Sequence, residues 1–353
     1  MTREVKRIAV VPGDGIGPEV ITEAVSVLEH LRETHGVTFE LKHFDWGADK
    51  FLSEGVTLPE GALEMLQREF DAILAGAFGD PRVPSNQHAE DILLGMRRGL
   101  DLYINLRPVR LLHQRLTPLR DRAVEDIDFV VFRENTEGAY GGAGGFLKKG
   151  TPDEVATQEE LNTRKGVERI IVAAFEYART RGKRRVTMAD KSNVQRFGGD
   201  LWQRVFKEVS ARYTDIEANH QYADAMAMFM VSNPRQYGVI VTNNLFGDIL
   251  TDLGAALQGG LGLAASGNIH PGRVSLFEPV HGSAPPLAGR REANPAGAIL
   301  SAALMLEYLG HAGAAEAVER AVRESIAEGE TTRDLGGTLS TEQAGEKIRA
   351  RIK

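Results

Sequence analysis

The chain has 353 residues, 42% of them hydrophobic and 26% charged, an ordinary composition for a globular protein of one large or two smaller domains. Its net charge of −7 argues against a general binder of nucleic acids or membrane surfaces, because both need a basic face. The absence of cysteine excludes disulfides, thiolate metal sites and a cysteine nucleophile, and no apolar run approaches the ~20 residues of a membrane helix. We expect a cytoplasmic protein without nucleic-acid or membrane partners.

The N-terminal part alternates strand-like and helix-like segments. Apolar runs at 8–11, 37–45 and 71–80 predict strands. Residues 18–32 and 60–70 have helical periodicity. The predicted buried face of the first helix comprises Val20, Ala24, Val25, Leu28 and Leu31. This alternation is typical of an α/β protein with parallel strands.

The rest of the chain continues this pattern. Further strands are predicted at 126–135, 183–190 and 237–244, and further helices at 165–181 and 245–257. The segment 294–310 is mostly apolar, so its helix must be well buried. The least regular stretch is 141–163, which predicts a loop or an excursion with weak strands.

A glycine-rich turn joins the first strand to the first helix. Its glycines, Gly13, Gly15 and Gly17, are spaced G-x-G-x-G, whereas a dinucleotide fingerprint is G-x-G-x-x-G with an acid about 20 residues later. The candidate acid here, Asp45, comes much later, and Asp14 within the turn would repel a pyrophosphate. A standard Rossmann site is therefore not expected. A tight strand-to-helix turn explains the glycines but not Asp14.

Two carboxylates lie four residues apart in the predicted helix 245–257. Asp248 and Asp252 would share one helix face, where like charges repel unless a cation lies between them. Oxygen ligands without cysteine suit Mg²⁺ or Mn²⁺. On spacing alone, a helix edge exposed to water is the alternative. Asp224 stands alone in an apolar segment, where a lone acid usually has a structural partner.

Arginines recur at the ends of predicted elements, as Arg97, Arg107 and Arg133. Taken singly, each is typical of a surface residue, but three together can clamp a multiply charged carboxylate. Lys191 follows another predicted strand, and Tyr140 is the hydroxyl-bearing aromatic nearest to the cluster in sequence. These residues are candidates for binding an anionic substrate.

Seven motifs occur in the order found in the β-decarboxylating dehydrogenases, which include isopropylmalate, isocitrate, homoisocitrate and tartrate/D-malate dehydrogenases. They are GDGIGPE, INLRP, RENTEGAY, DKSNV, NLFGDILTDL, EPVHGSAP and ANPAGAILSAALML. The chain resembles this family from Arg7 to near its C-terminus. A non-catalytic protein of the same fold is disfavoured, because the lysine, tyrosine and aspartates of the motifs are all present.

The resemblance implies an α/β fold of the isopropylmalate dehydrogenase type, not Rossmann, with two domains that share a mixed β-sheet. The first domain, on the cofactor side, would be discontinuous and comprise 1–101 plus 260–353. The second, 102–259, would carry dimerisation and the metal and substrate side. The family is typically a homodimer whose active sites are shared across the interface.

The resemblance also implies the chemistry, which is oxidative decarboxylation of a 2-hydroxy acid with a β-carboxylate. Asp248 and Asp252, with Asp224 from across the interface, would hold Mg²⁺ or Mn²⁺. Lys191, also from across the interface, would help to remove the hydroxyl proton, and Tyr140 would protonate the enol left by loss of CO₂. Arg97, Arg107 and Arg133 would hold the carboxylates until one departs.

The cofactor is expected to be NAD. Residues that match family cofactor contacts are Ile16, Glu278, His281, Gly282, Ser283, Ala284 and Asn294. NAD-using members usually carry an aspartate where this chain has Pro286, and NADP-using isocitrate enzymes tend to carry Lys-Tyr at Pro286-Leu287. Arg290 and Arg291 lie close enough in sequence to leave NADP open.

The substrate is expected to be 3-isopropylmalate. In the family, specificity comes from the helix before INLRP, where Leu93 and Leu94 suit an isopropyl group, with Glu90 one turn earlier. Val194 is likewise apolar. The motif RENTEG instead resembles tartrate/D-malate and homoisocitrate members, which are the alternatives. Core packing is the alternative role for Leu93 and Leu94.

The glycine turn acquires a different interpretation from the resemblance. It would line the cleft near the nicotinamide, with the adenosine end of the cofactor near His281 and Asn294. Asp14 would then fix the loop by accepting hydrogen bonds from backbone N–H groups.

Overall fold

The structure, a computed structural model, describes residues 5–353. The chain forms two compact units, the first made of Met1–Leu102, Arg110–Val124 and Ala255–Lys353, the second of Tyr103–Val109 and Glu125–Gly254. The predicted boundaries, 1–101 plus 260–353 and 102–259, assigned 110–124 to the second domain. This segment instead packs with the first unit.

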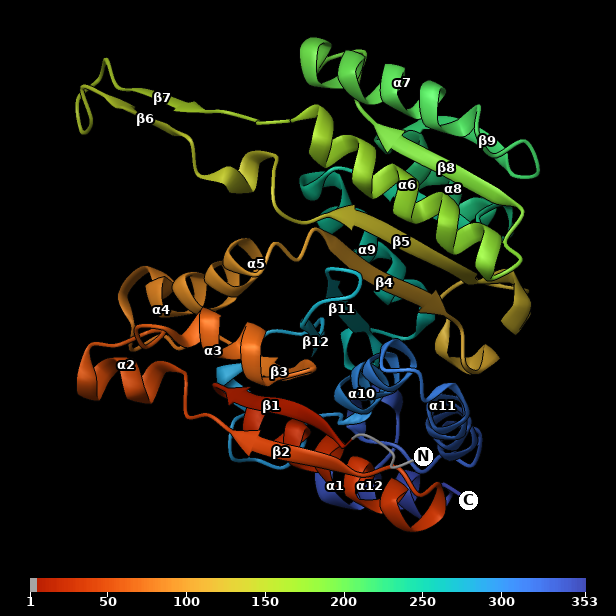
Figure 1. Cartoon of the computed structure of the whole chain (residues 1–353). Helices are drawn as coiled ribbons and strands as arrows, with labels where there is room; N and C mark the ends of the chain where they lie inside the picture. Colours follow the sequence, from red (N-terminus) through yellow and green to blue (C-terminus); the bar gives the residue numbers. More distant parts are fainter. Residues whose placement is uncertain (1–4) are drawn as a thin grey trace. The chain divides into compact units, whose positions relative to one another are not determined.

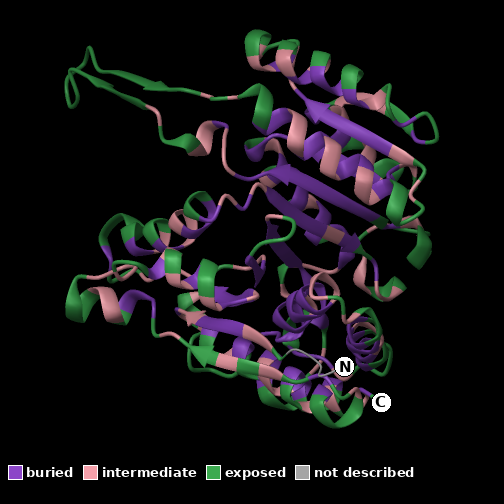
Figure 2. Ribbon diagram, in the orientation of Figure 1, coloured by how far each residue is buried: buried purple, intermediate pink, exposed green. Residues whose placement is uncertain are grey.

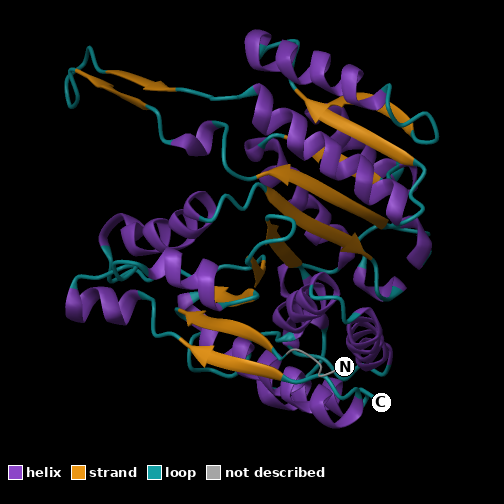
Figure 3. Cartoon of the chain, in the orientation of Figure 1, coloured by secondary structure: helices purple, strands orange, loops and turns teal. Residues whose placement is uncertain are grey.

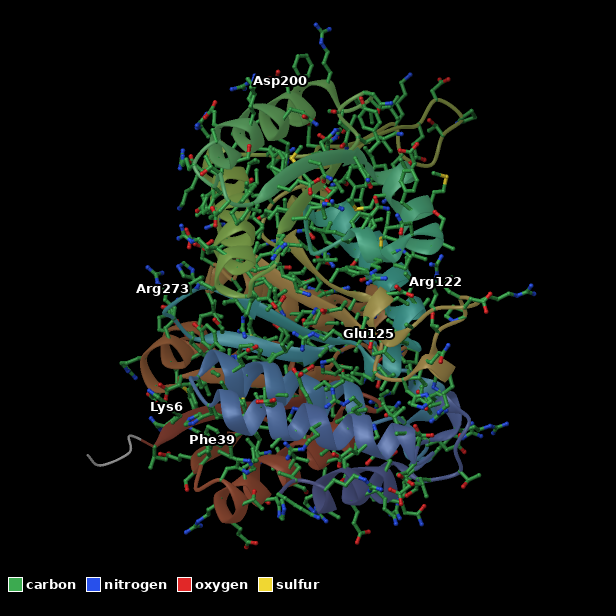
Figure 4. All side chains as sticks on the ribbon, turned by 90° about the vertical axis from the view of Figure 1, so that its right-hand side faces the viewer. Lys6, Phe39, Arg122, Glu125, Asp200 and Arg273 are labelled. Carbon is green, nitrogen blue, oxygen red and sulfur yellow. The ribbon has the colours of Figure 1, made fainter. Side chains whose placement is uncertain are left out.

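The first unit contains five strands, in the order β2 (Phe39–His43), β1 (Lys6–Gly13), β3 (Ala72–Ala77), β12 (Ser275–Pro279) and β11 (Ala265–Ile269) (Figure 1). The pairs β2–β1, β1–β3 and β3–β12 are parallel, whereas β12–β11 is antiparallel, so the sheet is mixed. Lys6 and Phe39, labelled in Figure 4, are the first register pair of β1 and β2.

Helices lie on both faces of these strands. Helix α1 (Gly17–Thr34) packs against α10 (Ala296–Tyr308) and α12 (Thr341–Ala350), and α10 packs against α11 (Ala312–Ala327). A second core joins Ala9 and Val11 of β1 to α3 (Ala62–Glu69) and α5 (Gly95–Gly99). Because strand side chains alternate, Ile8 and Val10 face the opposite side. The shorter helices of this unit are α2 (Ala48–Glu54) and α4 (Gln87–Ala89).

The predicted elements of this unit occur close to their expected bounds. The face of α1 differs in one residue, since Val25 is only half-buried while Ile21 and Val27 are fully buried. Helix α10 is buried along most of its length, as its apolar sequence predicts.

Five strands of the second unit pair side by side in a sheet, apart from the hairpin described below. Their order is β4 (Ile104–Arg110), β5 (Asp128–Glu134), β10 (Val239–Thr242), β8 (Arg185–Asp190) and β9 (Glu217–Tyr222). The last four pair in parallel. Figure 3 shows the accompanying helices, α6 (Arg164–Thr180), α7 (Arg196–Ser210), α8 (Ala223–Ser232) and α9 (Asn244–Gln258). Helix α6 packs on β5, β8 and β10 and also against α7.

The irregular segment predicted at 141–163 contains an antiparallel hairpin of β6 (Gly144–Leu147) and β7 (Val155–Gln158). Every residue of both strands is exposed, and Figure 2 shows the hairpin in the colour of exposed residues throughout. Three of these exposed residues are large and apolar, namely Phe146, Leu147 and Val155. Among residues 5–353, no helix combines the length and apolar character that crossing a membrane requires.

Candidate active site

Two arginines of the second unit converge on one face of α9. Arg107 comes from β4 and Arg133 from β5, which are neighbouring strands. Arg133 is almost fully buried, and its Nη1 donates a short hydrogen bond to Oδ1 of Asp248. Its Nε donates to Oδ1 of Asn244 at 2.8 Å. The helix can lie this close because residue 247 is glycine, where a Cβ would meet Cγ of Arg133 at 2.5 Å.

Arg107 connects this pair to the next turn of α9. Its Nη1 donates to Oγ1 of Thr251 at 2.6 Å and lies 3.8 Å from Oδ1 of Asp252, while its Nη2 lies 3.9 Å from Oδ1 of Asp248. Arg107, Arg133, Asp248 and Asp252 therefore lie together in the second unit, whereas Arg97, the third arginine of the predicted clamp, belongs to the first unit.

Tyr140 belongs to the same cluster. Its hydroxyl donates to Oδ2 of Asp248 at 3.1 Å, and the guanidinium of Arg133 lies 5.1 Å from the centre of its ring. Burial raises the pKa of Tyr140, and the opposing effect of Arg133 does not cancel this rise. The phenol therefore keeps its proton at neutral pH and can act as an acid.

The two carboxylates of α9 differ in acidity. Burial raises the pKa of Asp248, but Arg133 and Arg107 outweigh it and leave the pKa below its usual value. For Asp252, burial dominates over Arg107 and the pKa is raised, with the charge of Asp248 adding to the rise. Asp248 is thus an anion at neutral pH.

Lys191 and Asp224 form a separate pair in the second unit. Lys191 lies directly after β8 and Asp224 in the first turn of α8, and Nζ of Lys191 donates to Oδ1 of Asp224 at 2.7 Å. This hydrogen bond lowers the pKa of Asp224. Val194, three residues after Lys191, is 70% exposed, so no apolar pocket within the described chain covers it.

The chemical type of the potential ligands in this cluster suits a hard divalent cation. Asp248 and Asp252 offer only carboxylate oxygens, and their side chains are accessible. Within residues 5–353, however, no three His, Cys, Asp or Glu side chains gather closely enough to hold a metal ion. The three predicted ligands are thus not together in one chain, since Asp224 is paired with Lys191.

Arg97 of the first unit has an unexpected partner. Its Nη2 donates to Oε1 of Glu278 at 2.8 Å, and both side chains are buried. The same oxygen accepts a bond from Asn268 at 2.8 Å. One residue expected to hold substrate and one expected to hold cofactor are therefore bonded to each other. The Nε of Arg97 is buried without a hydrogen-bond partner.

Glu90, Leu93 and Leu94 lie in a π-helical turn, Glu90–Leu94, between α4 and α5. Ile92 and Met96 of this segment are core residues, whereas Leu93 and Leu94 are only half-buried and Glu90 is exposed. Full core packing, the alternative role for the two leucines, is therefore not what the structure has.

Of the residues expected to bind cofactor, Glu278 lies in β12, Ile16 directly before α1, and the others in the chain between β12 and α10. The backbone N–H of Ile16 donates to the carbonyl of Ser283 at 2.9 Å, and a Cβ on Gly15 would lie 2.0 Å from that carbonyl oxygen. Next to Ser283, a Cβ on Gly282 would meet nothing within 4 Å, so space is open there. Ala284 has a left-handed backbone, with φ of 40°.

His281 and Asn294 differ in their freedom to bind a ligand. Burial lowers the pKa of His281, whose ring is therefore neutral at pH 7, and its buried Nε2 has no hydrogen-bond partner. Asn294 is occupied, because its Nδ2 donates to Asp334 at 3.0 Å and its Oδ1 accepts from the N–H of Ala296 at 3.0 Å.

Asp14 has the role expected from the sequence. It is only 7% exposed, and its Oδ1 and Oδ2 accept the backbone N–H groups of Ala48 and Gly79 at 2.6 and 2.8 Å. A structural carboxylate therefore occupies the position that a pyrophosphate would need in a Rossmann turn.

Several partners of these groups were not predicted from the sequence. Asn244 and Thr251 hold the two arginines, and His88 bonds Asp14. Asp190 accepts bonds from the N–H of Ser192 and from Nε2 of His220, which fixes the backbone beside Lys191. Asn244 and Thr251 could have been found, because both lie within one helix turn of Asp248, whereas His88 and His220 become neighbours of Asp14 and Asp190 only in the fold.

Comparison with known proteins gives the same family throughout the chain. A sequence model of the isocitrate/isopropylmalate dehydrogenase family matches residues 7–348. The chain is 49% identical to a 3-isopropylmalate dehydrogenase of Thermobifida fusca over 100% of this chain and 99% of that protein. It is 48% identical to one of Frankia casuarinae over 98% of this chain and 99% of that protein.

Solved structures agree with the fold. The isocitrate dehydrogenase from Methylococcus capsulatus is 37% identical, with a TM-score of 0.89 and coverage of 99% of both chains. The TT0538 protein from Thermus thermophilus is 36% identical, with a TM-score of 0.88 over 100% of this chain and 69% of that one. The expected α/β fold class is thereby confirmed, and the chain belongs to the isocitrate/isopropylmalate dehydrogenase family.

Proposed function

We propose that this chain catalyses the metal-dependent oxidative decarboxylation of 3-isopropylmalate to 2-oxoisocaproate, a step of leucine biosynthesis, with NAD as hydride acceptor. The observation that carries the proposal is the convergence of Arg107, Arg133 and Tyr140 on the Asp248–Asp252 pair. Such a cluster combines cations for substrate carboxylates, an acid and metal-binding oxygens. The names of relatives that are 48–49% identical support the choice of substrate.

The arginines are proposed to bind the substrate carboxylates. Arg107 and Arg133 come from rigid, neighbouring strands, and their guanidinium groups are held by Thr251 and Asn244. A planar guanidinium can bind a carboxylate through two parallel hydrogen bonds. Arg97 of the first unit is proposed, from the family resemblance, as a further ligand of a substrate carboxylate. Fixed cations of this kind are present before substrate binds, so little reorganisation is needed during the reaction.

Lys191 and Tyr140 are proposed to transfer the protons of the reaction. When bound, a divalent cation on the aspartates would polarise the substrate hydroxyl, and a nicotinamide would accept the C2 hydrogen as hydride. Nζ of Lys191 takes the hydroxyl proton as C2 becomes a carbonyl carbon. The C3–carboxylate bond then breaks, CO₂ leaves, and the electron pair of that bond forms an enolate. The Tyr140 phenol gives a proton to C3, which completes the 2-oxo acid.

The cofactor proposal depends on the loop from Glu278 to Asn294. The neutral ring of His281 directs Nδ1 toward the carbonyl of Gly282, so the unpartnered Nε2 can accept a hydrogen bond, for example from an adenine amino group. The open space beside Gly282 fits a close approach of a ligand to the backbone. The residues present therefore fit a dinucleotide, without a role for the Gly13–Gly17 turn as a phosphate cradle.

NADP is the second candidate cofactor. Arg290, Arg291 and Arg333 line a cavity of about 570 Å³ near Asn294, and Arg291 pairs with Glu342. Such a cavity suits an additional phosphate. We favour NAD because Pro286 and Leu287 supply no positive group at the positions where NADP-using relatives carry one.

The site is proposed to be completed in a homodimer. Exposed apolar residues accompany the ligand aspartates on their helices, with Met228 and Val231 one and two turns after Asp224 on α8. Leu245 and Ile249 lie on the face of α9 that carries Asp252. Burial of these faces against a second copy would bring Asp224 and Lys191 of one copy to Asp248 and Asp252 of the other. The exposed hairpin β6–β7 offers further apolar area for the same contact.

The proposed function is tested by steady-state kinetics with Mn²⁺. Reduction of NAD and NADP is measured with isopropylmalate, D-malate, tartrate, isocitrate and homoisocitrate. We expect the highest kcat/KM for isopropylmalate with NAD, because the half-buried leucines favour an apolar third substituent. If kcat/KM is higher for D-malate or tartrate, that compound is the substrate instead of isopropylmalate. If kcat/KM is higher with NADP, the cofactor is NADP instead of NAD. Absence of reduction with all five would leave a non-catalytic binding protein.

Replacement of Leu93 and Leu94 together by serine tests the apolar pocket. KM for isopropylmalate should rise about 10- to 100-fold, because each lost hydrophobic contact weakens discrimination by ~1–3 kcal/mol. KM for D-malate, which has no isopropyl group, should change far less. The matched control is Leu52→Ser, an exposed leucine on α2. Equal effects on the two substrates would remove both leucines from the pocket.

A further inference from the structure

A buried histidine is bonded to the carboxylate of the glycine turn, and the proposed chemistry does not use it. His88 is fully buried, and its Nε2 lies 2.7 Å from Oδ2 of Asp14. The other ring nitrogen, Nδ1, is buried without a hydrogen-bond partner. Since Nε2 faces a carboxylate, it carries the ring proton and donates. The His88 ring also stacks on the ring of Phe51 in α2, and the two ring centres are 6.1 Å apart.

Asp14 therefore joins four segments of the first unit. It belongs to the turn after β1, and it accepts N–H groups from Ala48 at the start of α2 and from Gly79 after β3. His88 adds the segment that leads into α5. The packing around the carboxylate leaves no spare room, because a Cβ on Gly47 would lie 2.6 Å from Oδ1 of Asp14. The position of this carboxylate is thus fixed from three sides before His88 binds it.

His88 is the polar member of a buried stripe on its own helical segment. His88, Ile92 and Met96 follow one another at intervals of four residues, and all three are 0% exposed. Ile92 and Met96 belong to the hydrophobic core, where contacts are not directional. The bond from His88 to Asp14 is directional, so it fixes the rotation of the segment and with it the direction of Leu93 and Leu94.

The backbone of this segment is irregular and needs such an anchor. Two consecutive residues before it, Ser85 and Asn86, have left-handed conformations with φ of 54° and 57°, which side-chain-bearing residues rarely adopt. The helix that follows begins without a side-chain cap and includes the π-helical turn Glu90–Leu94. Strained or π-helical backbone persists only where surrounding contacts determine it, and it is common at functional sites.

The geometry points to His88 as a positioning residue that, through Asp14, sets the orientation of Glu90, Leu93 and Leu94 and so determines which substituent of the substrate is accepted. This inference rests on the proposed function for its substrate, but the structural device does not depend on that substrate. His88 touches neither substrate nor cofactor. It acts by bonding the segment that carries Leu93 and Leu94 to the Asp14 carboxylate, which the glycine turn fixes in place.

The test compares three variants in the full-length protein. His88→Leu removes the donor, and His88→Gln restores one at a similar reach. Val322→Ala, in the buried face of α11, destabilises the same unit without touching this network. For each variant we measure Tm, the ratio of kcat/KM for isopropylmalate over D-malate, and amide hydrogen exchange of residues 87–97.

His88→Leu is expected to lower the selectivity ratio about 10- to 100-fold, mainly through KM for isopropylmalate, because a misplacement of ~1 Å has effects of that size. Exchange in 87–97 should become faster than in wild type. His88→Gln should recover most of the ratio, and Val322→Ala should lower Tm while leaving both the ratio and exchange in 87–97 unchanged. An unchanged ratio in a folded His88→Leu protein, or an equal loss in Val322→Ala, would overturn the inference.

Failure of the proposed function has a different signature. If wild type reduces no cofactor with isopropylmalate, the proposed substrate is wrong, and hydrogen exchange still decides the structural part. Unchanged protection of 87–97 in His88→Leu would then reject the positioning role by itself. Faster exchange confined to 87–97, with the amides of Ala48 and Gly79 still protected by Asp14, would support it.

Discussion

Lys191→Ala is expected to reduce kcat by about 10²–10⁴-fold, the usual loss when a positioned general base is removed. Nζ of Lys191 bonds Asp224 at 2.7 Å and lies 5.6 Å from the centre of the Tyr222 ring; Asp224 and Tyr222 are both exposed, so folding should depend little on these contacts. The loss should therefore appear in kcat with Tm nearly unchanged. The assay is metal-dependent NAD reduction with isopropylmalate.

The control for Lys191→Ala is Lys207→Ala, an exposed lysine on α7. This variant should retain wild-type kinetics. Added methylammonium should partly restore the activity of Lys191→Ala, because a small amine can occupy the space left by the side chain. A kcat within about tenfold of wild type would assign the base to another residue. A large fall in Tm would instead mean that the Lys191–Asp224 pair is structural.

The sequence was most informative where a local pattern determines the structure. Helix α1 follows from its apolar spacing and from Pro18 in its first turn, and the strand ends at Arg133 and Lys191 follow from apolar runs that stop at charged residues. The spacing of Asp248 and Asp252 placed both on one face of α9, and the structure puts both near Arg107. These predictions needed only periodicity.

Contacts between distant segments could not be predicted in this way. The bond between Arg97 and Glu278 joins residues 181 positions apart, and that between His88 and Asp14 joins residues 74 apart. Nothing in the local sequence around His88 separates it from an exposed histidine, and the left-handed Ser85 and Asn86 are not glycines. Asp14 is an intermediate case. A carboxylate does not suit a phosphate-binding turn, so the sequence indicated a structural role for it. The structure then identified its two backbone donors, Ala48 and Gly79.

If active sites are shared between two copies, as proposed, two inactive chains should complement each other. One chain carries Lys191→Ala, the other Asp252→Asn, and each bears a different affinity tag so that the heterodimer can be purified. If one copy supplies Lys191 and Asp224 and the other supplies Asp248 and Asp252, one site of the heterodimer holds both substitutions and the other holds neither. The heterodimer should then recover about half of the wild-type activity, while both homodimers stay nearly inactive.

A second heterodimer serves as the control, because it should not recover activity. It tests whether pairing with another chain restores activity by itself. When both substitutions are in one chain and the partner is wild type, every shared site contains one defect, so activity should remain near that of the single variants. Sites formed within one chain would reverse the two results, with about half activity here and none in the first heterodimer. We propose the shared arrangement because, within residues 5–353, no three potential ligands gather, and Asp224 is bonded to Lys191. The exposed faces of α8 and α9, which carry Asp224 and Asp252, would then account for both the interface and the metal site.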